Sequence, residues 1–209
     1  MFTQTGSSGF VDGSMVDPRR EGGDGVKKVS YGVWEGVRPE AEIQTGYLTA
    51  EERLRLCTRA GMWGGGLPAD WGSNEAEMFA VLQYLREMVH RSDDPSAERV
   101  LVLSDCQGVL SSIERAWRAG KAWACKNRDR GGMIEAICHL RAQLGTVVLA
   151  WCPGHRGVSG NEYADMIAKA HLDATPDETT RTIASMVYSR DAYAMPCTNA
   201  RVSTMMDGS

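Results

Sequence analysis

Four acidic residues lie beside apolar segments, at positions where the local structure does not require an acid. They are Asp12, Glu77, Asp105 and Asp165. Taken singly, each has an ordinary explanation: a turn for Asp12, a helix start for Glu77 and Asp105, and a solvated acid near a helix terminus for Asp165. Clustered carboxylates repel one another, and divalent cations remove that penalty. Such oxygen ligands suit Mg²⁺ or Mn²⁺, and two ions about 3.5–4 Å apart suit in-line phosphoryl displacement.

A single histidine, His155, lies in a glycine-rich loop just before the last of these acids. The apolar segment 146–152 predicts a strand, and Pro153 ends it. A helix is expected from Asn161, with Asp165 about one turn inside it. A lone surface histidine is weak evidence for any function. The loop by itself is therefore consistent with a simple turn, with a metal site or with part of a larger site.

The apolar pattern predicts the elements that must position these residues. Strands are expected at 9–16, 29–36, 99–105 and 146–152, with a third strand within 59–72. Helices are expected at 74–91, 108–117, 133–144 and 161–172, and shorter ones near 49–57 and 178–189. The early strands resemble a meander, whereas the later ones are separated by helices, which requires parallel crossovers. We therefore expect an α/β fold with a mixed sheet and helices on its faces.

Composition places the chain among ordinary globular proteins. It has 209 residues, of which 43% are hydrophobic, and a net charge of −4. This balance lacks the global basic character of many nucleic-acid binders, although local patches matter more than totals. No apolar run approaches membrane-spanning length, and the N-terminus does not look like a secretory signal. The six cysteines form no CxxC pair, which favours reduced thiols inside a cell, in the nucleus or cytoplasm.

Four stretches of the sequence resemble, in the right order, the motifs of type 1 ribonuclease H. They are FVDGS, SNEAEMFAVL, LSDCQGV and PGHRGVSGNEYADMIAKA. The last is the most specific, and it looks most like the RNase H domains of non-LTR retroelement polyproteins and their eukaryotic relatives. The resemblance implies a five-stranded RNase H-like sheet whose first three strands are antiparallel and the rest parallel. Two features depart from the family: Cys106 stands where serine is commoner, and the stretch before Asn74 is longer than usual.

The resemblance also implies roles for individual residues. The four acids match the family's metal-binding carboxylates, so the chain is expected to cut the RNA strand of RNA–DNA hybrids with two Mg²⁺ ions, or Mn²⁺, leaving 5′-phosphate and 3′-hydroxyl ends. His155 matches the histidine of a mobile loop, where it could relay a proton or help product leave. Asn74 and Gln107 match positions that approach the minor groove of the hybrid.

A basic segment with interleaved tryptophans, WRAGKAWACKNRDR (117–130), resembles a short form of the basic protrusion of some RNases H. It could grip DNA phosphates in a salt-dependent and sequence-independent way. The candidate contacts are Lys121, Lys126, Arg128 and Arg130. A solvated loop is the alternative, and core packing explains the two tryptophans at least as well.

The expected domain organisation is a flexible N-terminus (1–8), an RNase H domain (9–172) with an extended segment at about 37–72, and a largely irregular tail (173–209). Because Asp12 lies so near Met1, no hybrid-binding domain is expected before it. We expect a monomer, with relatives that are parts of larger reverse-transcriptase polyproteins. The alternatives are a catalytically silent nucleic-acid-binding module from a retroelement, another RNase H-like nuclease such as an exonuclease or integrase, and an interaction domain with chance acids.

Overall fold

A computed structural model describes residues 6–21, 25–35, 61–120 and 128–176 of the chain. The strands are β1 (Gly6–Val16), β2 (Lys28–Glu35), β3 (Met62–Leu67), β4 (Arg99–Ser104) and β5 (Thr146–Trp151). The helices are α2 (Ser73–Arg91), α3 (Gln107–Ala119), α4 (Arg128–Gln143) and α5 (Ser159–Ala170), with short 3-10 helices η1 (Pro18–Glu21) and η2 (Pro95–Ala97). None of the helices within these ranges is long and apolar enough to cross a bilayer.

The five strands form one mixed sheet in the order β3-β2-β1-β4-β5. The pairs β1–β2 and β2–β3 are antiparallel, whereas β1–β4 and β4–β5 are parallel. In the central parallel pair Phe10 lies opposite Leu103, so Asp12 and Asp105 follow these partners by two residues each. The carboxyl ends of parallel strands are where α/β sheets gather functional side chains, and β4 delivers Asp105 at such an end.

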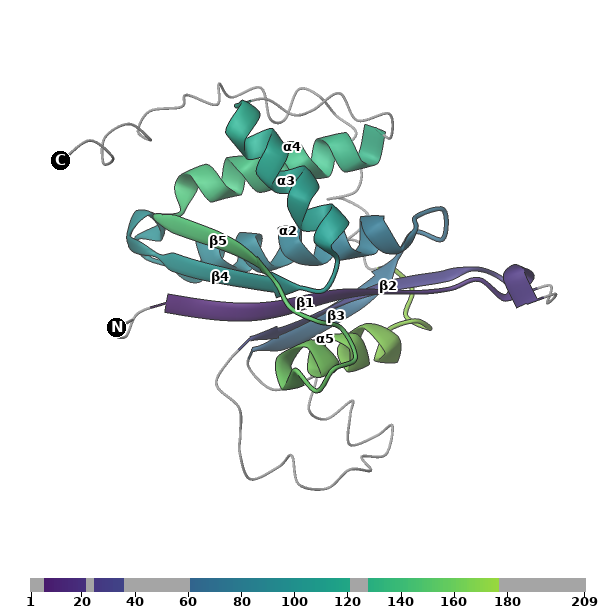
Figure 1. Cartoon of the computed structure of the whole chain (residues 1–209). Helices are drawn as coiled ribbons and strands as arrows, with labels where there is room; N and C mark the ends of the chain where they lie inside the picture. Colours follow the sequence, from purple (N-terminus) through teal and green to yellow (C-terminus); the bar gives the residue numbers. More distant parts are fainter. Residues whose placement is uncertain (1–5, 22–24, 36–60, 121–127, 177–209) are drawn as a thin grey trace.

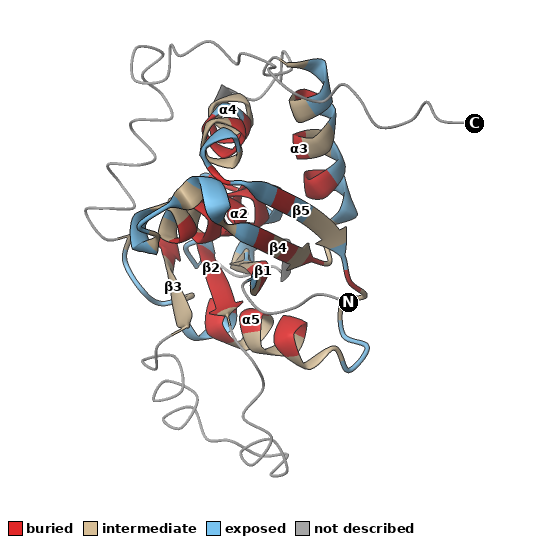
Figure 2. Ribbon diagram, turned by 90° about the vertical axis from the view of Figure 1, so that its left-hand side faces the viewer, coloured by how far each residue is buried: buried red, intermediate tan, exposed pale blue. Residues whose placement is uncertain are grey.

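Helices cover both faces of the sheet (Figures 1 and 2). The helices α2, α3 and α4 lie on one face, and α5 lies alone on the other, beneath β1, β2 and β3. Most of the core lies between the sheet and α2, where Phe79, Tyr84 and Leu85 have no exposed surface. A smaller cluster joins Trp34 to Ile167 of α5. The sheet is therefore the middle of three layers.

Two glycines in the central strands let helices approach the sheet closely. A Cβ atom at Gly13 of β1 would lie 2.5 Å from the backbone nitrogen of Glu77, and one at Gly32 of β2 would collide with the backbone of α5 at Ala164. A larger residue at Gly13 would therefore push the start of α2 away from β1. This glycine is what allows Glu77 to come beside Asp12.

The predicted fold class is confirmed: the sheet is mixed, its first three strands are antiparallel, and helices lie on both faces. The third strand, expected within 59–72, is β3. The expectation for the N-terminus was partly wrong, because residues 6–8 belong to β1, where Gly6 and Ser7 pair with the start of β4. The helices expected near 49–57 and 178–189 lie outside the described residues, as does most of the 37–72 segment.

Candidate active site

Asp12 lies in the middle of β1, the central strand, and only 6% of its surface is exposed. The neighbouring backbone N–H of Gly13 donates a hydrogen bond to its Oδ1 atom over 2.7 Å. An acid is a poor strand former, so its placement inside a strand needs a compensating partner. The turn proposed as its ordinary explanation is absent here, because β1 continues beyond Asp12 as far as Val16.

Glu77 lies in the first turns of α2 and points toward the sheet, with 6% of its surface exposed. The hydroxyl of Ser104, the last residue of β4, donates to its Oε2 atom over 3.1 Å. The start of the helix is closed by Glu75 instead, whose Oε2 atom accepts from the Gly72 N–H over 3.0 Å. Glu77 is therefore not needed as a helix cap, and its carboxyl is available to the site.

Asp105 directly follows β4, and its carboxylate makes no cap for α3. The residue at the N-cap of α3 is Cys106, and no side chain caps this helix. The Asp105 carboxylate instead accepts from the Nδ2 atom of Asn161 over 3.2 Å. Gly154 lies so close that a Cβ atom there would collide with Oδ2 of Asp105. The chain after β5 and the start of α5 together hold this carboxylate in place.

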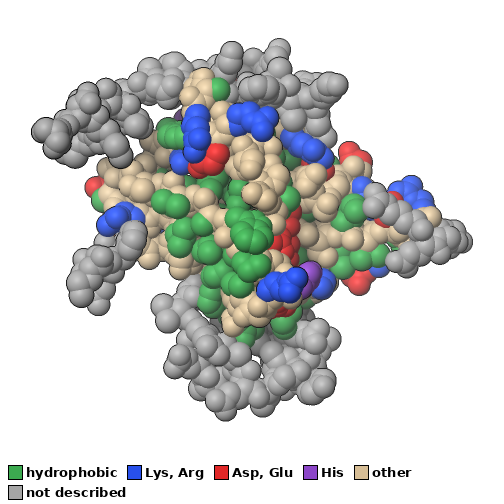
Figure 3. Space-filling model, in the orientation of Figure 1, with side chains coloured by type: hydrophobic (Ala, Val, Ile, Leu, Met, Phe, Trp, Pro, Cys, Tyr) green, Lys and Arg blue, Asp and Glu red, His purple; other side chains and the backbone are tan. Residues whose placement is uncertain are grey.

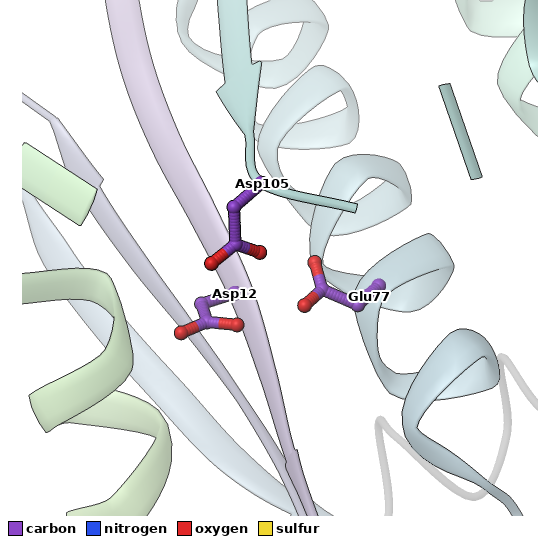
Figure 4. A group of neighbouring side chains, drawn as sticks. All are labelled: Asp12, Glu77 and Asp105. Atoms are coloured by element: carbon purple, nitrogen blue, oxygen red, sulfur yellow. The ribbon is translucent and has the colours of Figure 1, made fainter. Parts of the chain in front are cut away.

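Asp12, Glu77 and Asp105 form one cluster, in which an oxygen from each carboxylate lies within 4.8 Å of the others. Figure 4 shows the three side chains pointing toward a common space from β1, α2 and the end of β4. Burial, together with repulsion from Asp105 and Asp165, raises the pKa of Asp12 to about 6. Burial, and a hydrogen bond to Asp12 in which Glu77 keeps the proton, raise the pKa of Glu77 well above its usual value.

This donor set fits a divalent cation. Three carboxylates converge without a described Lys or Arg among them, and the cost of their mutual repulsion shows in the raised pKa values. A cation would relieve that repulsion, and oxygen ligands are those that hard ions such as Mg²⁺ and Mn²⁺ prefer.

Asp165 is not part of the three-carboxylate cluster. It lies on α5, and its Oδ2 atom accepts from Nζ of Lys169, one turn along the helix, over 2.7 Å. It remains near enough for its charge to contribute to the raised pKa of Asp12. His155 lies on the exposed loop after β5 with a φ of 51°, a left-handed conformation that is uncommon for a residue with a side chain. The roles of both residues remain predictions.

The residues predicted to touch nucleic acid are distributed between two regions. Asn74 at the start of α2 and Arg130 on α4 line a cavity of about 280 Å³, together with Arg115 of α3. The Nε atom of Arg130 donates to Oε1 of the buried Glu75 over 2.5 Å. Gln107 is the exposed first residue of α3. Lys121 and Lys126 lie outside the described residues, and of Arg128 only its place as the first residue of α4 is described.

The polar residues that hydrogen-bond the carboxylates could not be recognised from the sequence. Asn161, 1% exposed, donates to Asp105 and accepts from the thiol of Cys152 over 3.4 Å. Burial, and the charges of Asp105, Asp12 and Glu77, raise the pKa of Cys152 to about 11, so its proton stays in place for this bond. The Asn-Glu pair in the last motif was a signal for Asn161, but its partners could not be read from it.

Comparison with known proteins gives the family. Residues 7–173 match the profile of the RNase H family. Ribonuclease H of Pseudomonas fluorescens is 27% identical over 120 residues, which cover 54% of this chain and 72% of that protein. Ribonuclease H of Nitratidesulfovibrio vulgaris is 32% identical over 107 residues, which cover 47% of this chain and 62% of that protein. The chain belongs to the RNase H family, as its motifs predicted.

Solved structures show the same fold at low sequence identity. The native protease-reverse transcriptase of prototype foamy virus superposes with a TM-score of 0.56 at 16% identity, over 81% of this chain and 21% of the viral one. LC11-RNase H1, solved in complex with an RNA/DNA hybrid, superposes with a TM-score of 0.52 at 12% identity, over 80% of this chain and 96% of that one. These likenesses support the five-stranded architecture.

Proposed function

We propose that this protein hydrolyses the RNA strand of RNA–DNA hybrids by internal, metal-dependent cleavage. The observation that carries the proposal is the convergence of Asp12, Glu77 and Asp105 in a chain of the RNase H family. Bound at this cluster, two Mg²⁺ ions would supply an activated water and stabilise the leaving oxygen, which gives 5′-phosphate and 3′-hydroxyl products. Mn²⁺ has the same ligand preference and is the proposed substitute.

In this proposal the protein's own groups fix the carboxylates before substrate arrives. Gly13 holds Asp12 through its N–H, Ser104 holds Glu77 through its hydroxyl, and Asn161 holds Asp105 through its amide. Each donor bonds to an oxygen of the carboxylate and so restricts its rotation. Such preorganisation reduces the free energy that must be spent on ordering ligands during the reaction.

Asp165 and His155 have supporting roles in the proposal. Asp165 would complete the ligand set from the α5 side. To do so it must exchange its bond to Lys169, whose side chain is exposed, so the ion pair is of low intrinsic strength. His155 would move a proton at the edge of the site or help the product leave. Its exposed position on a loop between β5 and α5 supports such a role.

Recognition of the hybrid rests on two kinds of contact. Asn74 and Gln107 start the two helices that flank the cluster, which supports their proposed contact with 2′-hydroxyl groups in the shallow minor groove. Arg115 and Arg130 line the cavity beside Asn74, and their charges support a phosphate contact with the DNA strand. We further propose that the protein acts as a monomer in a reducing compartment, nucleus or cytoplasm, where the described thiols Cys106, Cys138 and Cys152 stay reduced and form no disulfide.

The decisive test offers labelled RNA as a hybrid with DNA, as duplex RNA and as a single strand, with Mg²⁺ or with EDTA. We expect Mg²⁺-dependent internal cuts in the hybrid only. Asp105→Asn should abolish cutting while circular dichroism and the unfolding midpoint show an intact fold, and Asp93→Asn, on the exposed residue just beyond α2, should cut normally. Robust cleavage by Asp105→Asn would remove the metal assignment, and equal cutting of duplex RNA would remove the substrate assignment.

A further inference from the structure

A second groove runs between α3 and the end of β5, and one of its lining residues, Trp151, is hydrogen-bonded to the backbone of Asp105. Its volume is about 670 Å³. The lining includes Gln107, Ser111, Arg115, Arg118, Leu149 and Trp151. Figure 3 shows this face of the molecule, with hydrophobic side chains gathered over β5 beside a strip of acidic ones, and basic side chains above them toward the helices. Gln107 and Arg115 already have proposed contacts with the hybrid, whereas Ser111, Arg118, Leu149 and Trp151 have no role proposed above. We call this hollow the Trp151 groove.

Trp151 forms one wall of the groove. More than half of its surface, 55%, is exposed, although it is a large apolar residue on an ordered strand. Its indole Nε1 atom donates to the backbone carbonyl of Asp105 over 3.1 Å. The ring is therefore held at a fixed place beside the residue that carries a catalytic carboxylate. A fixed and exposed aromatic face of this kind is a platform on which a nucleic-acid base can stack.

The opposite wall is one face of α3. Gln107, Ser111, Arg115 and Arg118 recur at helical spacing, so they follow this face from its first residue toward its last turn. The row rises about 1.5 Å per residue, which makes it about 16 Å long. The row begins near the catalytic cluster with the side-chain amide of Gln107 and ends with the two arginines. A nucleic-acid strand that leaves the cluster along this helix would meet the amide first and the arginines after it.

The charge in the groove is positive. The Arg118 side chain is 81% exposed, and its contact with Glu114 is long, at 3.9 Å. Glu114 itself is paired at 2.7 Å with Arg141, which is largely buried under the helix. Because Arg141 already neutralises this acid, the exposed Arg118 leaves an excess of positive charge in the groove. An aromatic face combined with arginines is typical of sites for single-stranded nucleic acid.

We propose that the Trp151 groove binds unpaired RNA that continues from the hybrid beside the catalytic carboxylates. This inference rests on the proposed function, because it places the RNA strand of a hybrid at the cluster. A rigid duplex presents stacked, paired bases, whereas an unpaired strand can turn out of the helix and lay a base on Trp151. The protein would therefore prefer hybrids that end in single-stranded RNA, such as those at the junction of an annealed and a free segment.

The test compares binding of four ligands in EDTA, so that no cleavage occurs. They are a blunt hybrid and the same hybrid with a short RNA extension at the 5′ end, with one at the 3′ end, or with a DNA extension. Fluorescence anisotropy should show at least about fivefold tighter binding of one RNA-extended hybrid than of the blunt one. Trp151→Leu and Arg118→Gln should each bring this ratio toward one, whereas Arg86→Gln, on an exposed position of α2, should keep it.

Three outcomes would overturn the inference: no preference for either RNA extension, an unchanged preference in both groove variants, or an equal preference for the DNA extension. Arg118→Gln keeps the test valid if Trp151→Leu fails to fold, because Arg118 is exposed. Cleavage of the blunt hybrid with Mg²⁺ is measured separately. If the blunt hybrid is not cut, the proposed function fails, whereas a lost extension preference with normal cutting removes only the groove.

Discussion

Asn161 donates a hydrogen bond from Nδ2 to Oδ2 of Asp105 over 3.2 Å, and so the last helix of the domain holds the carboxylate that follows β4. Both residues belong to segments that are far apart in the chain. The amide is buried and receives its own hydrogen bond from Cys152. The orientation of Asp105 is therefore set by α5 and by the chain after β5, as well as by the strand that carries it.

Asn161→Ala should lower the turnover of hybrid cleavage by about tenfold, which corresponds to about 1.4 kcal/mol. A hydrogen bond to a charged group contributes about 1.5–3 kcal/mol, and without it the carboxylate is free to rotate. Steady-state cleavage and urea unfolding would show the change, with Gln143→Ala at the exposed end of α4 as the control. Unchanged turnover in a folded Asn161→Ala protein would show that the amide does not position Asp105.

Without metal, the folded protein should become less stable as pH rises through the acid range, because of Asp12. Its pKa in the fold is about 6 and its ordinary value is 3.8, so the folded state holds the proton more tightly. The stability from this proton is fully present below about pH 4 and is lost as pH rises through 6. In EDTA, Asp12→Asn should therefore be more stable than wild type at pH 7.5, by roughly 2 kcal/mol, and much less so at pH 4.

Urea unfolding at both pH values, with and without Mg²⁺, provides this measurement. Mg²⁺ should stabilise wild type and leave Asp12→Asn nearly unaffected, because binding to the native state alone shifts the unfolding equilibrium. If the difference between the two proteins in EDTA is the same at pH 4 and pH 7.5, the raised pKa of Asp12 is refuted.

Gly154→Ala should impair catalysis through a collision with Asp105. A methyl group at this position would meet the Asp105 carboxylate, so either the loop or the carboxylate must move. Gly157→Ala is the matched control, because Gly157 has a φ of 79° and no atom within 4 Å of an added Cβ. That control carries backbone strain of about 1–2 kcal/mol but no collision. We expect at least a tenfold loss of turnover in Gly154→Ala and only a stability loss in Gly157→Ala; similar turnover in the two variants would contradict the collision.

The ion pair between Glu75 and Arg130 should hold the start of α2 against α4. Glu75 is 4% exposed, and the pKa of its carboxyl lies below the usual value because hydrogen bonds and the charge of Arg130 outweigh its burial. Glu75→Gln and Arg130→Gln should each destabilise the protein by about 1–3 kcal/mol. The double variant should lose less than the sum, since the two changes remove one interaction. Strict additivity in urea unfolding would show that the pair is not coupled, and Arg118→Gln serves as the exposed control.

Much of the fold could be predicted because each element has a local signature. The nearly continuous apolar run of β4 and the helical spacing in α2 and α5 gave these elements within two residues of their observed bounds. The start of β1 was missed because GSS at residues 6–8 has little strand propensity. These residues are ordered by pairing with β4, a contact between distant segments that no local pattern reports.

The candidate site could be predicted only in part for the same reason. Asp12, Glu77 and Asp105 stood out because acids there conflict with the local pattern, and the structure brings them together. The partners that orient them, such as Ser104 and Asn161, are ordinary polar residues in sequence and acquire meaning only through distant contacts. The link from Arg130 to Glu75 was likewise not visible, because a basic residue near other basic residues predicts solvent or phosphate as its partner.

The parallel pairing of β1 with β4 has a consequence for the order of events during folding. The three carboxylates come from residues 12, 77 and 105, and Asp105 is oriented by Asn161, so the site is complete only after these distant segments have met. Contacts of this range form slowly, because the intervening chain must first be closed into loops. Nuclease activity would therefore appear as a late event and could serve as a kinetic reporter of the completed sheet, after helical signals have already reached their final value.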